Sequence, residues 1–240
     1  MLHDYYHRLL ACRVWSIHHA PRLMREAVSL MGGCGVTEDC PGFVGYKWID
    51  SQMEAIGEDP PGVAQRQFGV AMTDEVFLTQ FRAWMRELQA VAATHPDIGA
   101  GALAVAMEVW LWTFQRLQHL SLGSRGAATL ALADALCGIL ASRAQSLDVI
   151  ELLRKSPDRA ALLSSLCQVQ AANVTREVGR VCAELVHGYG GSSAGEEFAP
   201  MQVLLDQALA GSLAARDRAL EAVIRIGIPV EQVADLPTPY

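Results

Sequence analysis

A glycine-rich turn is the first feature of this 240-residue chain whose residue types suit chemistry. Gly32, Gly33 and Gly35 follow a long helical pattern, and glycines just past such a pattern are typical helix stop signals. Because glycine has no Cβ, the backbone can come close to another molecule, and its N–H groups can meet a phosphate or a nucleotide edge. The same short string also suits an ordinary helix end, so the glycines alone leave both interpretations open.

An acidic turn farther along the chain is the second candidate. Glu58 and Asp59 precede Pro60 and Pro61, a pair that suits the first turn of a helix. A carboxylate can act as a general base when a dry, apolar pocket raises its pKa. Acidic side chains are also favoured just before a helix, because they interact with its free N–H groups and its dipole. Glu58 is therefore either a catalytic base or a helix-capping residue, and its acidic neighbour favours capping.

The remaining candidates favour structural roles. His18 and His19 are neighbours on a helix, so their rings point about 100° apart and cannot share one metal ion. The sequence predicts no metal site. Trp110, Trp112 and Phe114 form a concentrated aromatic group, for which packing in a core or a subunit interface is the expected role.

Helical periodicity dominates the elements that must position these residues. Apolar residues recur at three- and four-residue spacing, and strand signals are nearly absent. The predicted helices cover residues 2–31, 46–56, 63–92, 98–120, 127–155, 158–188, 198–210 and 213–226. Pro21 lies inside the first of these and is expected to kink or split it. Long helices joined by short turns predict an all-α fold of antiparallel helical bundles.

Composition and charge narrow the function classes. The formal net charge is −7 without any Lys/Arg run, which argues against nucleic-acid and anionic-membrane partners. The six cysteines have no CxxC spacing, and the first residues do not resemble a signal peptide. No uninterrupted apolar run reaches the roughly 20 residues of a membrane span. The sequence therefore predicts a soluble, cytoplasmic protein with reduced cysteines and no membrane span.

The surroundings of the glycine turn resemble one enzyme family. Residues 25–39 read REAVSLMGGCGVTED, which is similar to the segment E-A-[V/M]-x-L-x-G-G-x-G-[Y/F]-T-E-[D/E] of acyl-CoA dehydrogenases. Residues 47–50 (KWID) stand where that family has x-x-R-D, and Glu58 follows at the spacing of the Glu in Y-E-G-T. Residues 64–66 (AQR) resemble the family's I-Q-R, with one extra residue in between. The resemblance covers roughly residues 8–75.

The resemblance implies specific roles for these residues. Gly32, Gly33 and Gly35 would contact FAD held by a neighbouring subunit, and Ser29 stands where many relatives have a Gln that reaches the same flavin. Glu58 would be the base that removes the α-proton of an acyl-CoA thioester while the flavin takes the β-hydride. The local sequence GEDP departs from Y-E-G-T, so the capping interpretation of Glu58 stays open.

The resemblance also implies a division of the chain and a partner. Residues 1–75 would be part of the family's C-terminal helical domain, and residues 76–240 a helical-bundle extension. The chain lacks a β-rich segment, so we expect a homo- or hetero-oligomer in which a partner chain supplies the N-terminal and β-barrel domains that bind FAD and acyl-CoA. Such a chain would be part of an oxidoreductase and inactive alone. The alternatives are a non-catalytic helical assembly or regulatory protein derived from that family, and an unrelated helical bundle with a chance glycine loop.

Overall fold

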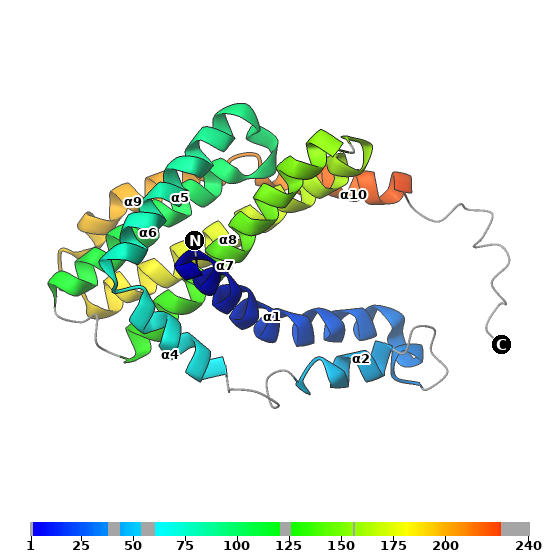
Figure 1. The fold of residues 1–240 in the computed structure, drawn as a ribbon, viewed down its shortest axis with the longest axis horizontal. Helices are drawn as coiled ribbons and strands as arrows, with labels where there is room; N and C mark the ends of the chain where they lie inside the picture. Colours follow the sequence, from blue (N-terminus) through cyan, green and yellow to red (C-terminus); the bar gives the residue numbers. More distant parts are fainter. Residues whose placement is uncertain (1, 38–43, 54–60, 121–125, 156, 227–240) are drawn as a thin grey trace, which may run out of the picture.

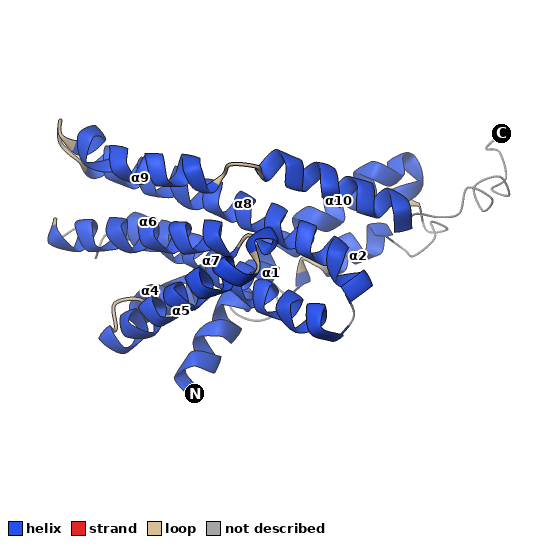
Figure 2. Cartoon of the chain, turned by 90° about the horizontal axis from the view of Figure 1, so that it is seen from above, coloured by secondary structure: helices blue, strands red, loops and turns tan. Residues whose placement is uncertain are grey.

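The structure is a computed structural model in which residues 2–37, 44–53, 61–120, 126–155 and 157–226 are described. Every regular element in these ranges is a helix, which confirms the all-α prediction (Figure 1; Figure 2). The α-helices are α1 (Leu2–Met31), α2 (Val44–Asp50), α4 (Pro61–Ala71), α5 (Glu75–Thr94), α6 (Ala100–His119), α7 (Gly126–Lys155), α8 (Pro157–Tyr189), α9 (Ala194–Ala208) and α10 (Ser212–Ile226). The described residues also form two short 3₁₀ helices, η1 (Gly32–Val36) and η2 (Pro96–Ile98).

The long helices α7 and α8 form the centre of the molecule. They pack along each other, and only one residue separates them in the chain. The chain must therefore reverse direction between them, and the two helices run antiparallel. Helices α1 and α4 pack on α7, while α9 and α10 pack on α8. Helix α6 contacts both central helices, and α5 packs on α6. The bundle is thus built outward from one helix pair.

Aromatic side chains fill the core where α5, α6 and α7 meet. Trp110 is fully buried, and its indole Nε1 donates a hydrogen bond to the backbone oxygen of Leu132 over 2.9 Å. The Trp110 ring stacks on the Phe114 ring, with the two centroids 5.3 Å apart. The ring centroid of Phe81, on α5, lies 5.1 Å from that of Trp110. Core packing of Trp110 and Phe114 is therefore confirmed, with the one polar atom of the indole paired as burial requires.

The prediction of a single helix over residues 63–92 is wrong. Two helices cover this range, since α4 ends at Ala71 and α5 begins at Glu75. The side chain of Asp74 accepts a hydrogen bond from the backbone N–H of Val76 over 2.9 Å and so caps α5. Phe68 and Met72 before the break and Phe77 after it are all buried, so an apolar periodicity continues across it. Val76, the second residue of α5, is 61% exposed and does not take part in this apolar periodicity.

Two other boundaries differ from the sequence prediction. Pro21 lies inside α1, and one continuous helix runs from Leu2 to Met31 without being split. The helix predicted over residues 46–56 is shorter at its end, since α2 covers Val44–Asp50, and residues 54–56 lie outside the described residues. Residues on both sides of the predicted division at 75 share one core, to which Phe68 and Phe77 both belong.

Among the described helices, α7 alone is long and apolar enough to qualify as a candidate membrane span. Its most apolar stretch is 56% buried inside the molecule. Leu132, Leu136 and Ile139 of this helix lie in the core beside α6 and α8. The apolar character of α7 therefore matches its central position in the helix bundle, as is common for core helices.

Substituting Gly99 tests the packing between η2 and α8. Its φ of +79° is left-handed, and a Cβ there would lie 2.5 Å from the Cβ of Ala171 and 3.0 Å from the Cα of Gln168. We expect Gly99→Ala to lower the free energy of unfolding in urea by about 1–3 kcal/mol, through backbone strain and overpacking. Gly126→Ala is the control, since a Cβ at Gly126 meets nothing within 4 Å. Equal stability of the two variants would contradict this packing.

Candidate functional site

The end of α1, together with η1 and α2, forms an arm that we define as residues 22–37 and 44–53. Helix α2 and η1 pack on α1 and on each other. Figure 1 shows α2 beside the C-terminal half of α1, extending away from the bundle of α4 to α9. A Cβ on Gly45 would lie 2.9 Å from the backbone oxygen of Gly35, so a glycine here lets α2 approach the turn closely.

The predicted glycine turn is present, and its three glycines differ in role. Gly32 and Gly33 are exposed, and a Cβ on either would meet nothing within 4 Å. Gly32 has a left-handed φ of +63°, the conformation in which helices commonly end. Gly35 is buried, and a Cβ there would lie 2.7 Å from the backbone oxygen of Val28. The chain itself therefore requires glycine at position 35, whereas Gly32 and Gly33 leave the backbone open to another molecule.

Ser29 lies on the last turn of α1, next to this open backbone. It is exposed, and its hydroxyl donates a hydrogen bond to the backbone oxygen of Arg25 over 3.0 Å. The hydroxyl proton is thus used within the helix, while the oxygen can still accept a hydrogen bond from outside. Ser29 and the glycine turn therefore lie on one continuous stretch of the arm.

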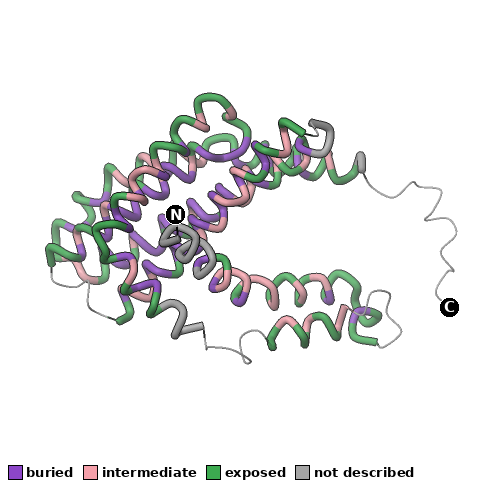
Figure 3. The backbone as a smooth tube through the Cα atoms, viewed as in Figure 1, coloured by how far each residue is buried: buried purple, intermediate pink, exposed green. Residues whose placement is uncertain are grey.

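The arm carries most of its large apolar side chains at the surface. Leu30, two residues before Gly32, is 89% exposed. The exposed apolar residues of the arm are Leu23, Leu30, Met31, Val36, Tyr46, Ile49 and Met53. Figure 3 shows the same contrast, with buried positions concentrated in the bundle and exposed ones along the arm. Several exposed large apolar residues on one short segment favour a surface that binds another molecule.

Glu58 lies outside the described residues. Its two interpretations, as a general base and as a helix-capping residue, both stay predictions. Asp39, the last residue of the motif over residues 25–39, also lies outside the described residues. The part of the site that the structure describes is therefore the turn, Ser29 and the apolar surface around them.

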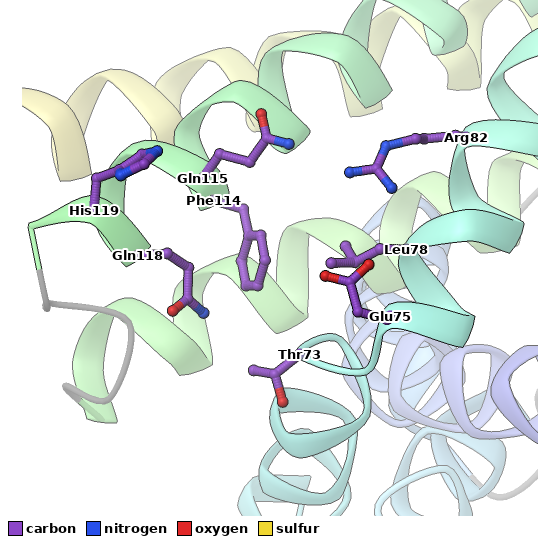
Figure 4. Close-up of a pocket in the computed structure, with 8 residues that line it drawn as sticks. All are labelled: Thr73, Glu75, Leu78, Arg82, Phe114, Gln115, Gln118 and His119. Carbon is purple, nitrogen blue, oxygen red and sulfur yellow. The ribbon is translucent and has the colours of Figure 1, made fainter.

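A groove between α5 and α6 is a second candidate that the sequence interpretation missed. Its cavity volume is about 700 Å³, and Figure 4 shows side chains of both helices converging on it. The lining residues are Thr73, Glu75, Leu78, Arg82, Phe114, Gln115, Gln118 and His119. They come from segments about 40 residues apart in the chain, so only the pairing of α5 with α6 brings them together.

A buried arginine joins α5 to α7. Arg143 is almost fully buried, pairs with the carboxylate of Glu87 and lies over the ring of Trp84 at 4.9 Å from its centroid. Its Nε and Nη1 atoms, and the hydroxyl of Ser142, have no hydrogen-bond partner in the described part of the chain. The ion pair and the aromatic face offset the cost of burying this charge, so a structural role accounts for Arg143.

Three cysteines belong to the core. Cys137, Cys167 and Cys182 are buried and free, and desolvation by burial raises the pKa of each thiol. The pKa of Cys182 rises to about 12, so its thiol stays protonated near neutral pH. A protonated, buried thiol is a poor nucleophile, and these residues act as small apolar side chains.

Comparison with known proteins gives no match: no family model, curated protein or solved structure is similar to this chain. The resemblance of residues 8–75 to acyl-CoA dehydrogenases therefore depends on the motifs alone.

His18 attaches α1 to α7. Its Nδ1 lies 3.1 Å from Oδ1 of Asp134, and this hydrogen bond raises the pKa of His18 above its ordinary value, against partial desolvation. A raised pKa in the folded state means that the pair stabilises the fold fully below the unfolded pKa of about 6.5. The stabilisation is lost as the pH rises through the raised folded value.

Replacing His18 tests this link. We expect His18→Gln to lower the thermal midpoint relative to the unmodified protein at about pH 5.5, and the difference to shrink towards about pH 8.5. Circular dichroism melts across this range measure the effect. His119→Gln is the control, because His119 is exposed and bonds to no other group in the described residues. A difference for His18→Gln that is constant with pH would contradict the pairing.

Proposed function

We propose that this chain is the helical component of a flavin-dependent, acyl-CoA dehydrogenase-like assembly. In this proposal the glycine turn of the arm lies against FAD held by a partner chain. The observation that carries the proposal is the open backbone of Gly32 and Gly33 within an exposed apolar surface. The motif over residues 25–39 supplies the link to this enzyme family.

The turn suits close approach by a planar ring system. No side chain projects from Gly32 or Gly33, and a flat group can therefore approach their backbone closely. The Ser29 oxygen lies one helical turn earlier and can accept a hydrogen bond. Gly35 contributes indirectly, because its packing against Val28 fixes the shape of the turn. FAD, when bound, supplies the redox chemistry, and the protein supplies position and hydrogen bonds.

The apolar arm gives the proposed complex its affinity. Full burial of one Leu-sized side chain contributes about 1.5–3 kcal/mol. Association costs about 4–15 kcal/mol in lost freedom, so burying several of the arm's seven exposed apolar residues can offset this cost. The partner chain would also supply the acyl-CoA site. Glu58 would either complete that site as the base or cap the start of α4.

Leu30 is the most direct probe of docking. The test uses an acyl-CoA dehydrogenase-like flavoprotein that co-purifies with this chain, and the absence of any such flavoprotein would contradict the proposal. We expect Leu30→Glu to weaken the complex by at least about tenfold, since a charge would be buried in an apolar interface. Isothermal titration calorimetry with the purified chains measures the change.

Leu213→Glu is the matched control, because Leu213 is 67% exposed on α10 and lies outside the arm. Both variants alter an exposed Leu, so both are expected to fold. If the two weaken the complex equally, or neither does, docking through the arm is wrong. If docking occurs with a partner that lacks flavin, the non-catalytic assembly protein becomes the better description.

A further inference from the structure

We propose that the groove between α5 and α6 binds a small organic carboxylate with an apolar body, and that Arg82 is its charge partner. The groove lies on helices that do not contribute to the arm, so this proposal is independent of the proposed function. Its cavity of about 700 Å³ falls within the range of about 300–1,000 Å³ usual for small-molecule sites.

Helical geometry builds the two walls. Glu75, Leu78 and Arg82 are spaced by three and four residues and share one face of α5. Because α5 and α6 are consecutive packed helices with a short connection, the start of α5 lies beside the end of α6. Phe114, Gln115, Gln118 and His119 form the opposite wall from that end of α6. Figure 4 shows the side chain of Arg82 extending across the groove towards Gln115.

Arg82 is an available cation. It forms no ion pair or hydrogen bond with any other group in the described part of the chain. Arg116, Arg143 and Arg180, in contrast, each pair with a glutamate. Glu75 lies on the same face of α5, but seven residues at about 1.5 Å each place the two backbones about 10 Å apart along the helix. The guanidinium therefore has donors free for a ligand.

The composition of the lining selects the ligand class. A guanidinium binds a carboxylate through two parallel hydrogen bonds, and the amides of Gln115 and Gln118 can add neutral ones. Leu78 and Phe114 are 7% and 4% exposed, and the small exposed part of each lines the groove as an apolar contact for the body of the ligand. The Glu75 carboxylate on the same wall disfavours a dianion, because its charge opposes the second negative charge. A singly charged carboxylate fits this balance better than a phosphate ester.

The test is an NMR titration of the full chain with 3-phenylpropionate, its neutral amide and phenyl phosphate. We expect 3-phenylpropionate to shift the side-chain amide signals of Gln115 and Gln118 saturably. The neutral amide should bind at least about tenfold more weakly, because it cannot pair with Arg82. No saturable shift with 3-phenylpropionate, or equal binding of acid and amide, would overturn the proposal. Tighter binding of phenyl phosphate would overturn the carboxylate assignment.

Substitution of Arg82 gives the second arm of the test. We expect Arg82→Gln to reduce binding of 3-phenylpropionate at least about tenfold and Arg86→Gln to leave it unchanged. Arg86 is an exposed arginine one turn along the same helix and does not line the groove. Equal loss in both variants would show attraction by general charge and overturn the role of Arg82. If Arg82→Gln does not fold, the comparison of acid with amide on the unmodified chain decides.

Discussion

The packing of α7 against α8 is the interaction on which the rest of the structure depends. Both helices have apolar positions over most of their length, and Leu136, Ile139, Val178 and Cys182 are all buried in the common core. Helices α1, α4, α6, α9 and α10 each pack on this pair directly, whereas α5 packs mainly on α6 and reaches α7 through the Arg143–Glu87 ion pair. Burial of apolar surface is the dominant stabilising term in such a fold, so contact with this pair positions most of the other helices.

Only part of helix α1 packs in that core. The first half of α1 buries Ala11, Val14 and Ile17 against the bundle, while its second half extends into the arm and exposes Leu30. The arm holds its shape through local packing, since Gly35 lies against Val28 and Gly45 allows α2 to approach the turn. Because α1 is packed in the bundle at its first half and exposes apolar side chains near its end, it can hold the glycine turn in a fixed position for binding a second molecule. The arm and the α5–α6 groove are separate surfaces, so each can be tested without disturbing the other.

Apolar periodicity was sufficient to predict the helical class and most of the long helices, because each buries a stripe on the same core. It missed the break at Asp74, since Phe68, Met72 and Phe77 keep an apolar spacing across it. The glycines in the sequence predicted where α1 ends. The difference between the buried Gly35 and the exposed Gly32 and Gly33 became visible only from the packing of Gly35 on Val28. The groove could not be predicted, because Arg82 and the end of α6 meet only through helix pairing.

The visible spectrum of the flavin reports whether the glycine turn lies against the flavin of a partner chain. Adding this chain to the purified flavoprotein partner should shift the flavin absorption bands as the complex forms. Gly33→Leu should abolish the shift, since its side chain would occupy the open space where the flavin approaches. A complex that forms at saturating concentration without any spectral change, or an equal shift with Gly33→Leu, would contradict the account.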